Sequence, residues 1–256
     1  MRVGVFQSDC GGLDADQRLA RLAAAMSDCQ FDLVVCPELF MSGYNVGDQL
    51  PDLAEPFDGP FSEKIAELAV EQECAIVYGY PERDYGKLFN SAVCIDAAGQ
   101  IIANQRKMIL PPGFEAKYFS SGSDQLLFDL KGVRCAILIC FDAEFPETAR
   151  AAAQAGAQLI IVPTALLQEW RSVAFQMMPT RAFENGVWLA YANHAGHENE
   201  MTLLGASCIV GPDGKDVVRA GADEELIFAE IDLAKIEQAR NKLPYLTDVK
   251  RLKDLS

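Results

Sequence analysis

The chain has 256 residues, of which 50% are hydrophobic and 23% charged, a composition that excludes a disordered or collagen-like protein. Its formal net charge of −15 argues against a nucleic-acid partner, because phosphate binding requires clustered Lys and Arg. No apolar stretch reaches the roughly 18 residues that a membrane helix needs, and the N-terminus lacks a signal-peptide core. We therefore expect a cytoplasmic protein with no membrane or nucleic-acid partner.

Cysteine and histidine usage speaks against disulfides and metal. The eight cysteines include no CxxC pair, and several, such as Cys36 and Cys135, lie within apolar runs, where a free cysteine behaves as a small hydrophobe. Only two histidines are present, and no ligand-type spacing occurs. The sequence therefore predicts neither a metal site nor any other cofactor.

Strands and helices alternate in the first half of the chain. The predicted strands are residues 2–7, 32–36, 74–80, 89–95 and 100–106. A helix between the first two strands begins at a capping box of Asp14 and Gln17. A second helix is predicted over residues 62–73 with Ser62 as its cap, and Gly99 suits a hairpin turn.

The second half repeats the alternation. Further predicted strands are residues 125–130, 133–139, 158–162, 187–193, 204–210, 215–220 and 226–231, and further helices are residues 146–156, 169–185 and 232–241. Because no linker or composition change interrupts the chain, residues 1–256 are predicted to form one α/β domain. The tail, residues 241–256, has few apolar residues, so it packs on a second subunit or trails in solvent.

Cys140 differs from the other cysteines in its position. It closes an apolar strand and precedes a helix that begins near Pro146, where the positive end of the helix dipole lowers a thiol pKa. A thiolate at this place would be a nucleophile. The alternative interpretation, which the local sequence alone favours, is a buried cysteine at the end of a strand.

A nucleophilic cysteine needs a base. His194 and His197 are candidates only because they exist, since two histidines in a polar loop are typical of a surface. Glu38 ends an apolar strand, a setting that raises the pKa of a carboxyl group. Lys107 also follows a strand, although solvent exposure is common there. All three reactive side chains would lie at the carboxyl ends of strands, where sites assemble in open α/β sheets.

The motifs around these residues resemble those of the nitrilase superfamily of carbon–nitrogen hydrolases. They are CPELFMSGY at Glu38, NQRKMIL at Lys107 and LICFDAEFPE at Cys140, and VYGYPER, RAFENGVWLAYAN, GASCIVGPDG and PYLTD extend the match over nearly the whole chain. The resemblance implies a four-layer αββα sandwich with a Glu–Lys–Cys triad. Glu38 would be the general base, Cys140 the nucleophile that forms a thioester, and Lys107 with the backbone N–H of Phe141 the oxyanion site.

The resemblance also implies a second glutamate between the lysine and the cysteine. Glu115 has the spacing of the aliphatic-amidase branch, with Asp124 and Glu144 as residues that could be confused with it. Family members form dimers or larger assemblies, and their tails cross to a neighbouring subunit. We therefore expect a homodimer or a higher homo-oligomer.

Within the superfamily the chain looks most like bacterial amidases of the 5-aminopentanamidase type. Glu144 replaces the arginine that the related omega-amidase branch carries, so it could pair with an ammonium group on the substrate. The alternative is a salt bridge to Arg150 or Arg181. Tyr44 and Trp170 are further candidates for substrate binding, whereas core packing is the favoured role of Phe175.

The predicted activity is hydrolysis of a small linear amide to a carboxylic acid and ammonia. Nitrilases of the superfamily usually have Cys-Trp-Glu at the nucleophile, and this chain has Cys-Phe-Asp, which favours an amidase. The alternatives are a nitrilase or an N-carbamoyl-amine hydrolase with the same triad, or a redox-sensing thiol protein without hydrolytic activity. Oxidation chemistry requires neither Glu38 nor Lys107.

Overall fold

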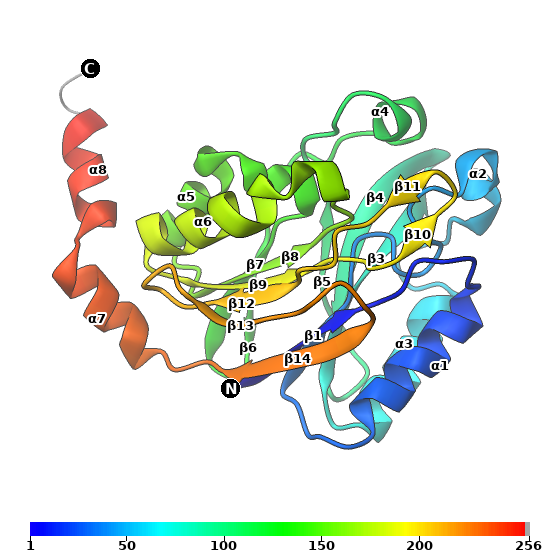
Figure 1. Cartoon of the computed structure of the whole chain (residues 1–256), viewed down its shortest axis with the longest axis horizontal. Coiled ribbons are helices and arrows are strands. Elements are labelled where there is room, and N and C mark those ends of the chain that lie inside the picture. Colours follow the sequence, from blue (N-terminus) through cyan, green and yellow to red (C-terminus); the bar gives the residue numbers. More distant parts are fainter. Residues whose placement is uncertain (254–256) are drawn as a thin grey trace.

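Two six-stranded sheets pack face to face in a computed structural model that describes residues 1–253 (Figure 1). The first sheet has the order β14-β1-β2-β3-β4-β5, with bounds Glu225–Glu230, Arg2–Gln7, Leu33–Val35, Ala75–Asp84, Lys87–Ile95 and Ile101–Arg106. The second has the order β13-β12-β9-β8-β7-β6, with bounds Asp216–Arg219, Cys208–Val210, Trp188–Ala192, Leu159–Pro163, Val133–Ile137 and Leu127–Leu130. Parallel and antiparallel neighbours occur in both sheets.

Helices cover the outer faces of both sheets (Figure 1). Helices α1 (Ala15–Met26) and α3 (Pro60–Glu71) lie on the first sheet, and α5 (Pro146–Gln154) and α6 (Met178–Asn185) on the second. The remaining elements are α2 (Leu50–Leu53), α4 (Phe114–Tyr118), the two-stranded hairpin β10 (His197–Glu198) and β11 (Met201–Thr202), α7 (Ala234–Lys242) and α8 (Tyr245–Lys253).

The central strands are apolar on both faces because each face meets another layer. In β8, Leu159 and Ile161 pack between the sheets, whereas Ile160 and Val162 pack toward α5 and α6. A continuous apolar run is typical of such doubly covered strands. The predicted α/β class and the four-layer αββα sandwich are confirmed.

Several local predictions are confirmed. Asp14 caps α1 and forms the capping box with Gln17, through hydrogen bonds of 2.8 and 3.0 Å. Pro146 is the first residue of α5, and Gly99 has a positive φ of 75° in the turn between β4 and β5.

Other local predictions are wrong. Ser62 lies inside α3, which begins at Pro60 after the cap residue Gly59. The predicted helix 169–185 is instead a 3-10 turn (Gln168–Trp170), a π-helical turn (Val173–Met177) and then α6. Pro179 lies at the start of α6, where its missing N–H interrupts a longer regular helix. The hairpin β10–β11 and the short helices α2 and α4 were not predicted.

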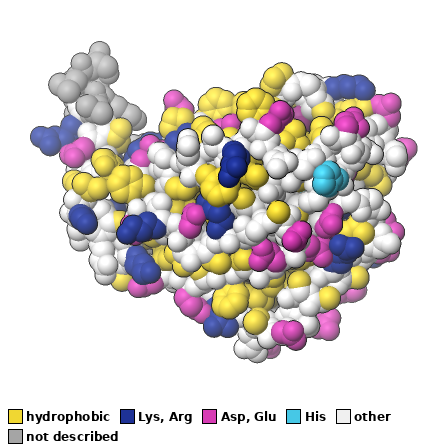
Figure 2. Space-filling view, viewed as in Figure 1, with side chains coloured by type: hydrophobic (Ala, Val, Ile, Leu, Met, Phe, Trp, Pro, Cys, Tyr) yellow, Lys and Arg dark blue, Asp and Glu magenta, His cyan; other side chains and the backbone are white. Residues whose placement is uncertain are grey.

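The predicted helix over residues 232–241 is confirmed as α7, and most of the described tail forms a further helix, α8. Helix α8 extends away from the sandwich toward the C-terminal end (Figure 1). The side chains of Leu243 and Tyr245 are each 40% exposed, and Figure 2 shows hydrophobic side chains where α8 meets α7. No helix within residues 1–253 combines the length and the apolar character needed to cross a membrane.

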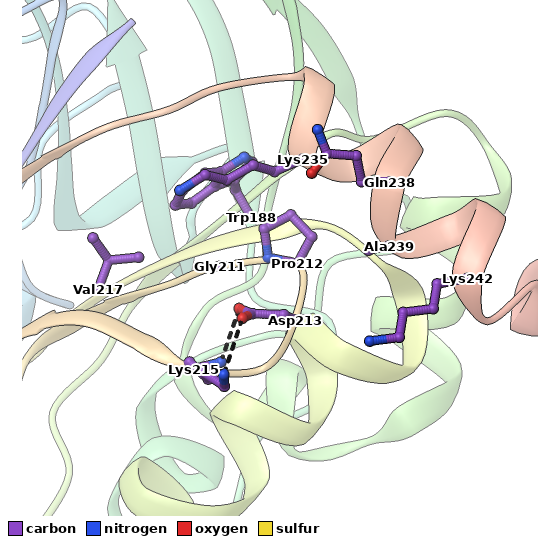
Figure 3. Close-up of a pocket in the computed structure, with 10 residues that line it drawn as sticks. All are labelled: Trp188, Gly211, Pro212, Asp213, Lys215, Val217, Lys235, Gln238, Ala239 and Lys242. Atoms are coloured by element: carbon purple, nitrogen blue, oxygen red, sulfur yellow. Dashed lines mark hydrogen bonds and ion pairs between the residues drawn. The ribbon is translucent and has the colours of Figure 1, made fainter.

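A groove of 360 Å³ lies beneath α7 (Figure 3). Lys215, Lys235 and Lys242 surround it, and Lys215 lies 3.8 Å from Asp213. The Lys235 ammonium lies over the buried ring of Trp188. None of the predicted site residues lines this groove.

Candidate active site

The three residues predicted to act together follow strand ends. Glu38 comes after β2, Lys107 directly after β5 and Cys140 after β7. Glu38 and Lys107 are fully buried, and their side chains meet, with 2.7 Å between Lys107 Nζ and Glu38 Oε1. Glu115 from α4 is also buried, and its Oε1 lies 2.6 Å from the same ammonium. The structure thus places one lysine between two carboxylates.

Two further side chains donate hydrogen bonds to this buried array. The Asn90 amide donates to Glu38 Oε1 at 2.7 Å and to Glu115 Oε2 at 3.0 Å, and the Tyr44 hydroxyl donates to Glu115 Oε1 at 2.8 Å. The sequence analysis missed Asn90. Its signal was an amide in the middle of the apolar strand β4, where a buried polar group needs partners.

Glu38 Oε2 is the one oxygen of the two carboxylates that is buried without a partner among the described residues. Burial raises the pKa of Glu38 to about 7; the Glu115 charge also raises it and Lys107 opposes the shift. The expected rise of the Glu38 pKa therefore agrees with its surroundings. Burial disfavours the charged form of Lys107, but the charges of Glu38, Cys140 and Glu115 together raise the pKa of the ammonium.

The Glu38 segment is held by close backbone approach. Leu39 has a positive φ of 49°, and a Cβ added at Gly79 would lie 2.4 Å from Leu39 N and 2.7 Å from Glu38 Cα. The backbone N–H of Gly79 also donates to the Pro37 carbonyl at 3.1 Å. Only glycine at position 79 permits this approach of β3 to the residue that carries the base.

Cys140 begins a 3-10 turn (Cys140–Glu144) and has a positive φ of 47°, which is uncommon for a residue with a side chain. Asp142 fixes this turn, because its buried carboxylate accepts the backbone N–H groups of Met108, Ile109 and Ile139. Asp142 thereby ties the segment after Lys107 to the segment of Cys140. The sequence analysis did not assign this role to Asp142.

The thiol pKa differs from the sequence-based expectation. Burial raises the pKa of Cys140, the Glu38 charge raises it further, and Lys107 lowers it. The expected lowering of the pKa by a helix terminus is therefore wrong for the resting site. A short 3-10 turn separates Cys140 from α5, so the thiol does not sit at the end of that helix.

A pocket of 420 Å³ opens onto Cys140. All the residues predicted to contact substrate line it, namely Tyr44, Glu115, Phe141, Glu144 and Trp170, together with the apolar residues Phe114, Leu166, Leu167, Val173 and Met201. Trp170 is 59% exposed.

Two other residues considered from the sequence lie elsewhere. Asp124 is exposed and does not line the pocket. Phe175 is 42% exposed beneath the guanidinium groups of Arg171 and Arg219, so the predicted core packing of Phe175 is wrong.

The carboxylate of Glu144 has no ion pair with a described residue. Arg150 and Arg181 pair with Glu184 instead, at 3.7 and 3.0 Å. Arg181 also donates to the backbone carbonyl of Glu144 but not to its carboxylate. Burial raises the pKa of Glu144, and the charges of Lys107 and Arg181 lower it. The pocket therefore has apolar walls and one carboxylate without a cationic partner.

The two histidines differ in their surroundings. His197 is exposed, but His194 is fully buried, and its Nε2 donates to the backbone carbonyl of Glu38 at 2.8 Å. The expectation of two surface histidines is therefore wrong for His194. Burial lowers the His194 pKa to about 3, and the Arg18 charge lowers it further. The eight cysteines are free, and the described residues contain no cluster of metal-ligating side chains.

Comparison with known proteins agrees with this geometry. The model of the carbon-nitrogen hydrolase family matches residues 13–241, so the chain belongs to that family. It is 43% identical to a "Hydrolase in pqqF 5'region" of Pseudomonas protegens over 97% of this chain and 88% of that protein. It is 34% identical to an (R)-stereoselective amidase of a Pseudomonas species, over 92% and 86% of the two chains.

Solved structures place the chain among amidases of the nitrilase superfamily. An amidase from Nesterenkonia sp. has 30% identity and a TM-score of 0.85, over 95% of this chain and 94% of that one. A second structure is of a variant of that enzyme in which acrylamide has added to the active-site cysteine. This chain is 30% identical to it, with a TM-score of 0.85 over 95% of this chain and 98% of that one. The chain is therefore a hydrolase of amide carbon–nitrogen bonds.

Proposed function

We propose that the chain hydrolyses a small linear amide to a carboxylic acid and ammonia through a thioester on Cys140. The observation that carries the proposal is that Cys140 and Glu115 line the same apolar pocket, and that Glu115 shares the buried Lys107 ammonium with Glu38. This arrangement supplies a nucleophile, a base and a cation without histidine.

In the first half of the reaction, Glu38 accepts the thiol proton while Cys140 Sγ bonds to the amide carbon. Glu38 Oε2 has no partner and a carboxyl pKa near neutrality, which suits this transfer. The Lys107 ammonium and the Phe141 N–H stabilise the oxyanion. The carbon–nitrogen bond then breaks, the proton passes from Glu38 to the departing amine nitrogen, and ammonia leaves a thioester.

In the second half, water replaces ammonia. Glu38 takes a proton from the water as its oxygen bonds to the acyl carbon, and Glu115 orients the water and the substrate. The carbon–sulfur bond breaks, Cys140 recovers its proton from Glu38, and the carboxylic acid is released. Lys107 keeps its charge in both halves because two carboxylates face it.

The substrate we propose carries an amino group on its acyl chain. The unpaired Glu144 carboxylate in an apolar pocket favours an ammonium group at the end of a hydrocarbon chain. The net charge of −15 favours the approach of cations. Tyr44 and Trp170 would contact the hydrocarbon part, and the enzyme would act as a homodimer or a higher homo-oligomer.

The test is ammonia release from an ω-amino amide, its ω-carboxy counterpart and a neutral amide. A hydrogen bond to a charged group contributes about 1.5–3 kcal/mol, so the amino amide should exceed the carboxy amide in kcat/KM by about tenfold to a hundredfold. Glu144→Gln should remove this preference and leave the neutral amide unaffected, whereas Cys140→Ala and Lys107→Ala should abolish turnover.

Salt distinguishes the pocket from the surface. If the net charge causes the preference for the amino amide, that preference fades at high ionic strength in both the wild type and Glu144→Gln. If Glu144 causes it, the preference persists at high ionic strength in the wild type. Equal amino-to-carboxy ratios in wild type and Glu144→Gln would contradict the amino substrate. Turnover of nitriles or N-carbamoyl amines alone would reassign the reaction, and oxidation of Cys140 without any turnover would indicate a redox thiol.

A further inference from the structure

A buried ion pair outside the catalytic array connects three parts of the chain. Arg18 of α1 is 1% exposed, and its Nη2 lies 3.7 Å from Oε1 of Glu198, which is 7% exposed. The Arg18 guanidinium also donates to the carbonyls of Cys10 at 3.0 Å and Leu13 at 3.2 Å, which fix its place. Burying such a pair is costly, and in some proteins a buried ion pair fixes geometry rather than adding stability.

Glu198 binds the loop that carries Tyr44. Its Oε2 accepts the backbone N–H of Asn45, and the amide of the next residue, Asn199, donates to the Asn45 carbonyl at 2.8 Å. Gly43 makes the contact possible, because a Cβ at this position would lie 2.3 Å from Glu198 Oε1. The hairpin β10–β11 is therefore fastened to the residue that follows Tyr44.

Both fastened segments reach the candidate site. The Tyr44 hydroxyl donates to Glu115, which contacts the Lys107 ammonium. Met201, on the second strand of the hairpin, lines the same pocket as Cys140. A shift of the Asn45 backbone would move the Tyr44 hydroxyl away from Glu115, and misplacement by about 1 Å is enough to cost catalysis.

We propose that Glu198, held by Arg18, is a positioning residue that sets the Tyr44 hydroxyl on Glu115 and holds Met201 in the pocket wall. Glu198 touches neither the substrate pocket nor Cys140 and acts through Tyr44. The inference rests on the proposed function for the roles of Glu115 and Tyr44.

The experiment is a double-mutant cycle of Glu198→Ala and Tyr44→Phe, read as kcat/KM for amide hydrolysis. Each single variant should lose about tenfold to a hundredfold, because each removes the placed hydroxyl from Glu115. The double variant should lose little more kcat/KM than the more impaired of the two single variants, since contacts in one network are not additive. Glu200→Ala changes an exposed residue of the same hairpin and should leave kcat/KM unchanged.

Multiplicative losses in the double variant, or wild-type kcat/KM in Glu198→Ala, would overturn the inference. If Glu198→Ala does not fold, Glu198→Leu, which keeps a similar size but offers no acceptor to the Asn45 N–H, enters the same cycle and should show the same non-additivity. If wild type releases no ammonia from any amide, the proposed function fails by itself. The same four proteins are then compared by the rate at which iodoacetamide alkylates Cys140, measured on the peptide that contains this residue. The changes in this rate in the two single variants should again be non-additive in the double variant.

Discussion

At the scale of single residues, the site is a problem of buried charge. Two carboxylates, Glu38 and Glu115, face one ammonium, so burial and mutual repulsion disfavour the second negative charge. Asn90 reduces this cost by donating to both carboxylates. The array therefore holds a carboxyl group that can gain and lose a proton near neutral pH, and the fixed Lys107 keeps its charge throughout.

The pH dependence of kcat/KM follows from the Glu38 pKa. The active free enzyme needs the Glu38 carboxylate as base, and its pKa is raised to about 7, so protonation on acidification should lower kcat/KM below that pH. Activity should rise with pH through about 7 and then level off. His194, with its pKa lowered to about 3, stays neutral over this range.

The measurement is kcat/KM with the neutral amide between about pH 5 and about pH 9, a range that includes the pKa expected for the base. His197→Asn alters the exposed histidine and should leave the profile unchanged. A profile that is flat across this range would contradict the assignment of Glu38 as the base.

At the scale of elements, strand ends and glycine contacts place the reactive side chains. Glu38, Lys107 and Cys140 follow β2, β5 and β7, and the first two belong to one sheet while Cys140 belongs to the other. The site therefore depends on how the strand ends of two sheets meet. Gly79 controls one of these ends through its contact with the backbone of Glu38 and Leu39.

Gly79→Ala should lower both stability and activity. The added Cβ meets only backbone atoms, so the Glu38 segment must shift, and overpacking of this kind costs about 1–3 kcal/mol of unfolding free energy. The displaced base should lower kcat/KM by about a hundredfold. Chemical denaturation and kinetics on one preparation measure both quantities.

Gly221→Ala is the matched control for this substitution. A Cβ there meets nothing closer than 3.5 Å and the backbone needs no positive φ, so both stability and kcat/KM should stay near wild type. Full activity in Gly79→Ala would show that the backbone of Glu38 tolerates displacement.

The sequence predicted the parts of the site that short patterns encode. Strand ends made Glu38, Lys107 and Cys140 candidates, although the local sequence favoured ordinary roles for Cys140 and Lys107, and the resemblance of the surrounding motifs to the nitrilase superfamily implied the triad. Asn90, Arg18 and Glu198 were missed, since their partners lie 52, 180 and 153 residues away along the chain in Glu38, Glu198 and Asn45. The thiol pKa was misjudged because burial, which no local pattern reports, outweighs the helix terminus.

At the scale of the whole molecule, the tail leaves the sandwich and carries exposed apolar side chains. Tyr245 of α8 lies against Phe183 of α6 with 5.7 Å between ring centroids, and the two rings are 40% and 39% exposed. Helix α6 also covers the sheet that carries Cys140 (Figure 1). An apolar surface continuous from α6 to α8 is typical of a subunit interface.

We expect a homodimer or a larger assembly that uses this surface, and Phe183→Glu should weaken it. Removing one buried aromatic side chain from an interface costs about 1.5–3 kcal/mol, so the dissociation constant should rise by about tenfold to a hundredfold. Light scattering at micromolar concentration measures the mass.

Phe57→Glu is the control. Phe57 is similarly accessible, at 45% exposure, but lies far along the chain from α6 and α8, so its substitution should leave the assembly intact. A wild-type mass of 28.0 kDa would contradict the assembly, and an unchanged mass in Phe183→Glu over a dilution series would show that α6 and the tail do not form the interface.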